Sequence, residues 1–484
     1  MAASDRLQRN LSPHAASVIL LTACAWSAAI SRADAADPLA GPWQGKLNLG
    51  AVELRLVFHL AADDKGRLTA TMDSPDQGAK GLPIESATRE GKQLKLEAKT
   101  IRGAFEGTVS DDGLKISGHW KQSGQSLPLE LTRLEKEPDY RRPQEPRPPF
   151  PYRVEQVTYR NAQADVQLAG TLTLPEAKHP VPAVLLLSGS GAQDRDETIL
   201  GHKPFSVLAD YLTRRGVAVL RMDDRGVGGS TGSTDQSTTA DLVDDALAGV
   251  EYLQSRREID PRHIGLLGHS EGAMIAPLSA TRTADVAFVI MLAGTGVNGE
   301  KIILQQGELI ARAQKADETR IAAGNDLQRQ VFDIVKNEPD AAKAEERIRA
   351  AMLRSEAYIS APSAEAKKAV EEQMAVQAKT VLTPWFRFFL TYDPAPALRK
   401  VRCPVLVLNG EKDLQVDPKQ NLPPIAAALK ESGNRDVTIR ELPGLNHLFQ
   451  HCRTGSPVEY GKIDETLAPE VLELVGDWIV ARAK

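Results

Sequence analysis

The sequence predicts an α/β domain with a mostly parallel sheet, preceded by a small antiparallel β domain. Before residue 135, short segments alternate apolar and polar residues and are separated by turns, which is typical of an antiparallel meander. From residue 152 onward, strand-like runs alternate with helical stretches, which is typical of a sheet covered by helices on both faces. The length of 484 residues suits two folded units, since single cores rarely grow beyond about 300 residues.

The antiparallel β domain is expected at 37–134, as a small barrel or sandwich. Its strand-like segments lie at 53–60, 68–72, 94–97 and 127–131, with turns at 64–66 and 111–113. Trp43 and Trp120 stand near the two ends of this region. Small barrels fill their interiors with side chains. We therefore expect both rings in the core, with a ligand pocket lined by them as the alternative.

The segment 135–151 is rich in proline and charged residues, which predicts an extended, semi-rigid spacer. We place the domain boundary in this segment. A proline-rich recognition site is the alternative interpretation, but a spacer between two cores accounts for the same residues.

The second domain is expected at 152–484. Its strand-like runs lie at 166–174, 183–187, 217–221, 264–267, 286–292, 405–408 and 437–442, and its clearest helical stretches at 204–214, 239–255 and 469–482. From about 299 to 381 the strands stop, and residues at helical spacing take over. An insertion there lies over the carboxyl ends of the strands, where ligands bind in open α/β sheets. The insertion predicts a helical cap; a plain helical subdomain is the alternative.

Residues 1–35 have the order of a secretory signal. Arg6 and Arg9 precede an apolar stretch that ends near Ile30, and small residues follow up to Ala35. We expect cleavage after Ala35 and a periplasmic or secreted protein. A lipoprotein carrying its lipid on Cys24 is the alternative. A stable membrane span is disfavoured, because the stretch is shorter than about 20 residues and contains polar side chains.

Composition narrows the class of partner. The net charge is −5, and lysines and arginines are scattered along the chain. The sequence therefore lacks the clustered positive charge typical of nucleic-acid binding, which favours a small-molecule substrate. No metal-ligand spacing and no complete phosphate-binding glycine motif occurs, so neither a metal nor another cofactor is expected. Cys403 and Cys452 are expected to be two unpaired thiols. The oligomeric state stays open.

The pentapeptide 268–272, Gly-His-Ser-Glu-Gly, has the spacing of a nucleophile elbow. A serine on a sharp strand-to-helix turn has a strained backbone, and glycines two positions before and after it remove side chains that would collide. Gly-x-Ser-x-Gly alone is a weak signal. Its context makes it specific, because an apolar strand precedes it and a helix-like run at 273–281 follows. Ser270 is the predicted nucleophile.

A serine nucleophile requires a histidine base and a carboxylate behind that histidine. His447 follows the strand that ends near residue 442, whereas His451 lies further along, so we favour His447. Asp413 follows the carboxyl end of the strand at 405–408. Asp417 is the competing acid, with a turn or helix-start position as its structural interpretation. The predicted triad is Ser270, Asp413 and His447.

Charge on the substrate carbonyl oxygen needs backbone N–H donors, one from the residue after the nucleophile, here Glu271. The second is expected from the glycine-rich turn after the strand at 183–187, with Ser190 preferred and Gly191 and Gln193 as alternatives. Two clusters of aspartate and arginine, at 194–196 and 223–225, are expected to pin loops through ion pairs; substrate contact is the alternative.

Six motifs occur in a consistent order, at 188–197, 201–205, 223–230, 268–272, 410–416 and 446–449. Together they resemble a family of bacterial α/β-hydrolases, the serine-dependent carboxylesterases related to dienelactone hydrolases and the prolyl-oligopeptidase-like group. The resemblance covers roughly 152–484 and implies the α/β-hydrolase fold with Ser270, Asp413 and His447 at the triad positions. It also implies an esterase acting on short acyl chains. A peptidase or amidase, and a non-catalytic envelope-binding protein on the same scaffold, are the alternatives.

Overall fold

The computed structural model describes residues 38–48, 53–77, 79–122, 125–139, 141–361 and 363–483. The expected signal segment 1–35, including Cys24, lies outside these residues. Within them, no helix is both long enough and apolar enough to cross a membrane. The thiols of Cys403 and Cys452 are not joined, in agreement with the expectation of two unpaired cysteines.

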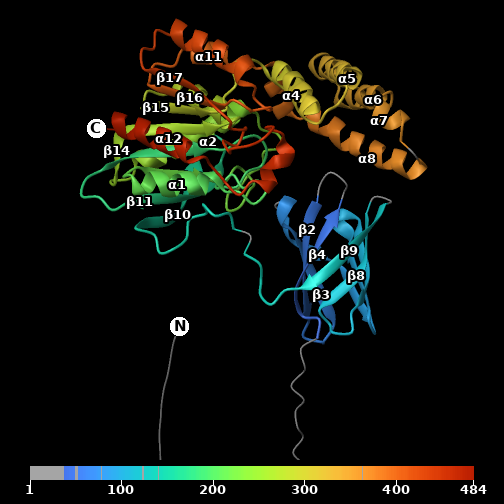
Figure 1. The fold of residues 1–484 in the computed structure, drawn as a ribbon. Helices are drawn as coiled ribbons and strands as arrows, with labels where there is room; N and C mark the ends of the chain where they lie inside the picture. Colours follow the sequence, from blue (N-terminus) through green and yellow to red (C-terminus); the bar gives the residue numbers. More distant parts are fainter. Residues whose placement is uncertain are drawn as a thin grey trace, which may run out of the picture.

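The first sheet is antiparallel and nearly closes into a barrel (Figure 1). Its strands are β1 Gly41–Asn48, β2 Glu53–Ala62, β3 Leu68–Ser74, β4 Ala79–Ile84, β5 Ser86–Glu90, β6 Gln93–Ala98, β7 Gly103–Val109, β8 Lys115–Gln122 and β9 Gln125–Arg133, with one-turn helices η1 Pro75–Gln77 and η2 Lys99–Ile101. The strand order is β4-β3-β2-β1-β9-β8-β7-β6-β5. Contacts of β3 with β5 and of β4 with β6 bring the two edges together. A small antiparallel β domain is therefore confirmed.

Aromatic rings fill the interior of this barrel. Trp43 lies opposite Phe58 in the β1–β2 register, and Phe105 lies opposite Trp120 in the β7–β8 register. All four side chains are buried in one apolar cluster. The two tryptophans therefore belong to the core, as small barrels require, and they do not line an open pocket.

The second sheet is mixed and mostly parallel, which confirms the predicted α/β class. Its strands are β10 Tyr152–Asn161, β11 Val166–Pro175, β12 Val181–Leu187, β13 Ala218–Met222, β14 Ile259–His269, β15 Phe288–Leu292, β16 Val405–Gly410 and β17 Val437–Leu442. The order is β10-β11-β13-β12-β14-β15-β16-β17, antiparallel at the β10 edge and parallel from β13 to β17. Strand β10 was not predicted from the sequence; it is an edge strand whose alternate residues are exposed.

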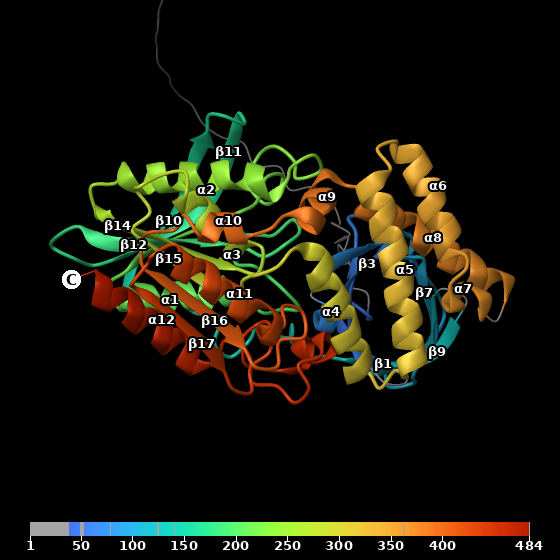
Figure 2. The same cartoon turned by 90° about the horizontal axis from the view of Figure 1, so that it is seen from above.

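Helices cover both faces of this sheet (Figure 2). One face packs against α2 Thr239–Gln254, α3 Gly272–Ala280, α10 Ala395–Leu398 and α11 Pro418–Glu431, and the other against α1 Pro204–Arg214 and α12 Pro469–Arg482; η3 Pro457–Lys462 lies in the connection before α12. Because both faces are covered, the central strands are apolar throughout rather than alternating. The continuous apolar runs of β12, β15 and β16 have this cause.

The helical insertion follows β15 and lies beside the sheet, above the β barrel in the view of Figure 1. It comprises α4 Gly299–Ala313, α5 Glu318–Asn337, α6 Ala341–Met352, α7 Glu356–Ile359, α8 Ala364–Val381 and α9 Pro384–Thr391. These helices enclose a separate apolar core that includes Phe332, Ile348, Phe386 and Leu390. The insertion therefore continues ten residues beyond the expected end at 381, through α9 to Thr391.

The segment 135–151 is docked onto the second domain rather than free of it. The Arg142 guanidinium is buried and donates to the carbonyl oxygens of Leu200, Gly461 and Ile463 at 2.8–3.0 Å. Gln144 donates to the carbonyl oxygen of Leu467 at 2.7 Å. These hydrogen bonds fix the path of the spacer where it reaches the α/β domain.

Candidate active site

Ser270 lies on the turn between β14 and α3, with a backbone φ of +53°. This left-handed conformation is costly for a residue with a side chain and persists only where its surroundings fix it. A Cβ added to Gly268 would lie 1.9 Å from the carbonyl oxygen of Gly272. A Cβ on Gly272 would lie 2.0 Å from the carbonyl oxygen of Leu187. Both glycines of the pentapeptide are therefore required by close backbone approach.

Replacing Gly272 with alanine should displace the elbow and reduce hydrolysis on the order of 100-fold, because misplacement of a reacting group by about 1 Å is that costly. The obstructing atoms belong to the backbone at the end of β12, which cannot rotate away. Gly324→Ala in α5 is the matched control, since an added Cβ there meets nothing within 4 Å. Comparison of kcat/KM and melting temperature for the two variants checks the expectation; equal behaviour would contradict it.

Asp413 and His447 meet at the carboxyl end of the sheet, from the loops after β16 and β17. His447 Nδ1 lies 2.8 Å from Asp413 Oδ2, and both side chains are buried. The other carboxylate oxygen of Asp413 accepts the backbone N–H groups of Gln415 and Val416, each at 2.8 Å. These bonds hold the carboxylate in place, so that Nδ1 of His447 donates to it and Nε2 is left as the basic nitrogen.

The His447 loop lies against the elbow. His269, the residue before Ser270, has its Nε2 3.0 Å from the carbonyl oxygen of His447, and the two imidazole rings are 4.8 Å apart between centroids. The structure thus places the His447 loop, with Asp413 paired to His447, against the elbow that bears Ser270, although these residues are far apart along the chain.

The two competing residues have other partners. Asp417 caps the N-terminus of α11 by accepting the N–H of Lys419 at 3.0 Å, as its alternative interpretation supposed. His451 is exposed, with Nδ1 2.9 Å from Glu465 and Nε2 3.0 Å from Glu470. Neither residue has the buried contact that joins Asp413 to His447.

The turn after β12 lies beside the elbow, where the second oxyanion donor was expected. A Cβ added to Gly189 would lie 3.5 Å from Cβ of Ser270, so the Gly189–Ser190 backbone passes close to the nucleophile. Asp224 holds this turn by accepting from the Ser188 hydroxyl at 3.1 Å and from the Gln193 N–H at 2.9 Å. Burial raises the pKa of Asp224 to about 7. The turn that begins at Gly189 therefore lies beside Ser270, and Glu271 directly follows Ser270 in the chain.

The aspartate and arginine clusters pin loops, as predicted. Arg195 forms a bidentate pair with Asp223, with nitrogen–oxygen distances of 3.0 and 2.5 Å. Arg221 pairs with Asp196, and Arg225 pairs with Asp245 of α2. These contacts fasten the loops after β12 and β13 to one another and to the domain core.

A buried carboxylate that was not predicted from the sequence, that of Glu271, links the elbow to the cap. Glu271 Oε1 accepts the Thr239 hydroxyl and the Trp385 indole N–H, each at 2.6 Å. Burial raises the pKa of the Glu271 carboxyl. Trp385 lies on α9, beyond the expected end of the cap, and its ring stacks on Phe389 at 5.3 Å. Nothing in the sequence marks this pair, because 114 residues separate the two partners.

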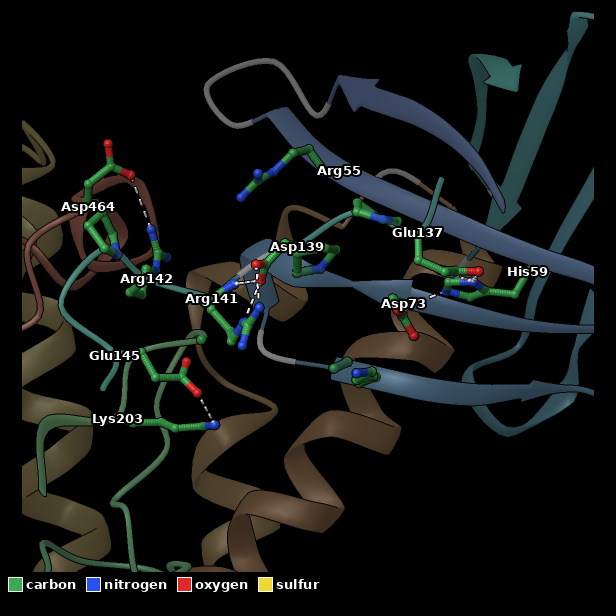
Figure 3. A pocket seen from close by; sticks show the side chains of 16 residues that line it. Arg55, His59, Asp73, Glu137, Asp139, Arg141, Arg142, Glu145, Lys203 and Asp464 are labelled. Carbon is green, nitrogen blue, oxygen red and sulfur yellow. Dashed lines mark hydrogen bonds and ion pairs between the residues drawn. The ribbon is translucent and has the colours of Figure 1, made fainter. Parts of the chain in front are cut away.

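A separate cavity of about 750 Å³ lies where the barrel, the spacer and the α/β domain meet (Figure 3). Charged side chains line it, and several are paired, including Arg141 with Asp139 and Lys203 with Glu145. His59 of the barrel contacts Asp73 at 2.9 Å and Glu137 of the spacer at 3.0 Å. None of Ser270, Asp413 and His447 lines this cavity.

Comparison with known proteins agrees with the α/β-hydrolase fold. Residues 203–451 match the family described as "Serine aminopeptidase, S33". The chain therefore belongs to this family of α/β-hydrolases. Within the described residues, no three His, Cys, Asp or Glu side chains are grouped so as to hold a metal ion.

The individual proteins that this chain resembles share 14–27% of its residues over the matched regions. Esterase EstD of Thermotoga maritima is 27% identical over 318 residues, which are 65% of this chain and 65% of that protein. The chain thus spans somewhat less than two thirds of this relative's length. The Pyrococcus furiosus esterase Pf2001 is similar at a TM-score of 0.40 and 14% identity, over 69% of this chain and 92% of that one. The proline iminopeptidase of Mycobacterium smegmatis is similar at 0.41 and 19%, over 68% and 99%.

Proposed function

We propose that the protein is a serine carboxylesterase that cleaves short-chain acyl esters through an acyl-enzyme. The observation that carries this proposal is the buried Asp413–His447 pair, whose loop lies against the strained turn that bears Ser270. A serine hydroxyl becomes a competent nucleophile only when such an oriented base receives its proton.

The reaction proceeds in two displacements. Ser270 Oγ attacks the ester carbonyl carbon while His447 Nε2 takes the hydroxyl proton, and the N–H groups of Glu271 and Ser190 stabilise the oxyanion. Collapse of the tetrahedral intermediate breaks the bond to the alkoxy group, which leaves as the alcohol with the proton from His447. A water molecule, deprotonated by His447, then attacks the acyl-serine, and the carboxylic acid is released.

Amide hydrolysis is the second candidate, favoured by the family description as a serine aminopeptidase. Assays of the purified protein with short-chain p-nitrophenyl esters and with matched p-nitroanilides of acyl-amino compounds distinguish an esterase from an amidase. We expect kcat/KM for the acetyl ester to exceed that for the matched anilide by at least about 100-fold, a difference of about 2.7 kcal/mol in transition-state stabilisation. Equal or greater anilide turnover would assign the protein to the amidases.

A binding protein on the same scaffold is the remaining alternative. Labelling of the purified protein with a fluorophosphonate tests it, because this reagent reacts covalently with an activated serine. We expect one label per chain; absence of label would favour the binding protein.

Export belongs to the same proposal. The order of charged, apolar and small residues in 1–35 supports a signal cleaved after Ala35, and hence a periplasmic or secreted enzyme. Lipidation at Cys24 is the alternative route to the envelope.

A further inference from the structure

Two buried ionisable residues beside the nucleophile have no part in the proposed mechanism. Glu197 lies in the loop between β12 and α1, and His269 is the last residue of β14. Their side chains are only 6% and 9% exposed. Glu197 also has a positive φ of +52°, so its surroundings hold the backbone in an uncommon conformation.

These two residues connect the two loops that flank Ser270. Glu197 Oε1 accepts the N–H of Gly189 at 2.6 Å and lies 2.8 Å from His269 Nδ1. On the other side of the ring, His269 Nε2 lies 3.0 Å from the carbonyl oxygen of His447. The chain of contacts therefore runs from the predicted oxyanion loop, through the elbow, to the loop of the predicted base.

Both ring nitrogens of His269 face acceptors. A neutral imidazole carries one N–H, whereas a carboxylate and a carbonyl oxygen each require a donor. A carboxylate and a neutral imidazole supply only one N–H for these two acceptors. Both contacts are satisfied only when the Glu197–His269 pair carries one additional proton. The pair is then neutral overall, which suits its burial, because an uncompensated buried charge is costly.

We infer that Glu197 and His269 form a second, proton-holding histidine–carboxylate pair that positions both the His447 loop and the Gly189–Ser190 turn around the nucleophile. This inference rests on the proposed hydrolase function and adds two positioning residues to it. We assign neither residue a proton transfer in the reaction. The pair acts through the backbone groups of Gly189 and His447, and the His269 ring also lies against the His447 imidazole, at 4.8 Å between centroids.

Charges around the pair support the retention of its proton. Burial alone would lower the pKa of His269, but the charge and hydrogen bond of Glu197 outweigh it, and the pKa of His269 is raised. Asp413, Asp224 and Glu271 also lie around this region, on the loops after β16, β13 and β14. Because His269 is a base with a raised pKa, the pair holds its proton to a higher pH than an ordinary histidine does and loses it as the pH rises further.

Loss of this proton leaves one ring nitrogen of His269 unprotonated, with its lone pair facing an acceptor. The contact with Glu197 or the contact with the His447 carbonyl must then break. Either the His447 carbonyl or the Glu197 carboxylate then loses its donor, and the corresponding loop is released. We therefore expect kcat to decline on the alkaline side of its pH profile, while substrate binding changes little.

The kinetic test uses His269→Gln, in which an amide nitrogen still donates toward His447 but the side chain does not titrate. We expect kcat to fall between about 10-fold and 100-fold, KM to change less than about threefold, and the alkaline decline to disappear. Glu197→Gln should lose the same decline.

His451→Gln is the matched control, since that histidine also contacts glutamates but is exposed. It should keep the wild-type profile. An unchanged alkaline limb in His269→Gln and Glu197→Gln, or an effect on KM alone, would overturn the inference.

A second measurement needs no substitution at the pair itself. In a pH titration of ¹⁵N-histidine-labelled protein, an ordinary histidine loses its second N–H proton near pH 6.5. The double variant His59→Gln/His451→Gln removes the two histidines that, among the described residues, contact carboxylates through both ring nitrogens. We expect one imidazole in this background to retain both N–H protons to a higher pH than the other histidines; loss of the second proton from every imidazole at the ordinary pH would refute the pair. Missing fluorophosphonate label on the wild-type protein would instead contradict the hydrolase proposal, and the ring-proton measurement would still test the pair.

Discussion

Replacing Ser270 with alanine should abolish turnover of p-nitrophenyl acetate, with a loss in kcat on the order of 10⁴-fold to 10⁶-fold. Without the hydroxyl, His447 has no serine proton to accept, and no nucleophile attacks the ester carbonyl. The variant should also fail to react with a fluorophosphonate, because no other serine lies on the elbow. Initial rates and mass spectrometry of the labelled protein measure both effects.

The fold should survive this substitution. Ser270 contributes its N–H to the carbonyl oxygen of Leu292 at 2.8 Å, and alanine keeps that N–H. An unchanged melting temperature and circular dichroism spectrum are the controls. Substantial residual turnover or covalent labelling in a folded Ser270→Ala protein would remove Ser270 from the mechanism.

Replacing Asp413 with asparagine should reduce kcat on the order of 10⁴-fold, the effect of the equivalent change in a serine protease triad. An amide directed at His447 Nδ1 can donate to that nitrogen, which favours the tautomer with its proton on Nε2. Nε2 then cannot accept the serine proton. The carboxylate that orients the imidazole is replaced by a group that orients it for the wrong proton transfer.

Asp417→Asn is the matched comparison. Asparagine caps helices about as well as aspartate, so α11 should begin normally and activity should stay within about threefold of wild type. Parallel measurement of kcat/KM for the two variants distinguishes them. Loss of activity in Asp417→Asn with retention in Asp413→Asn would transfer the role of the acid to Asp417.

Much of the α/β domain could be predicted because its strands are continuous apolar runs between helical stretches. The expected helix at 204–214 coincides with α1, and the run at 405–408 lies within β16. The edge strand β10 was missed for a physical reason. One side of it faces solvent and only β11 pairs with it, so charged residues are tolerated along its length and the apolar signal is weak.

The end of the cap was misplaced at 381 because composition marks the surface helices, not the helix that packs inward. Helices α5 and α6 carry many charged residues at helical spacing. By contrast, α9 is short and aromatic, begins with a proline, and packs Phe386 and Leu390 into the core of the cap. Such a segment does not resemble an amphipathic surface helix, and its burial is decided by its neighbours.

The sequence by itself determined the class of the second domain and predicted the elbow at Ser270, with Asp413 and His447 as its partners. Each prediction depends on residue types at fixed local spacing or on position after a strand. Only the tertiary structure decided the nearly closed barrel, the Glu271–Trp385 contact and the Glu197–His269 pair. Each of these joins residues that are distant along the chain. Their contacts follow from how the loops fold over the sheet, and no local pattern of residues encodes that arrangement.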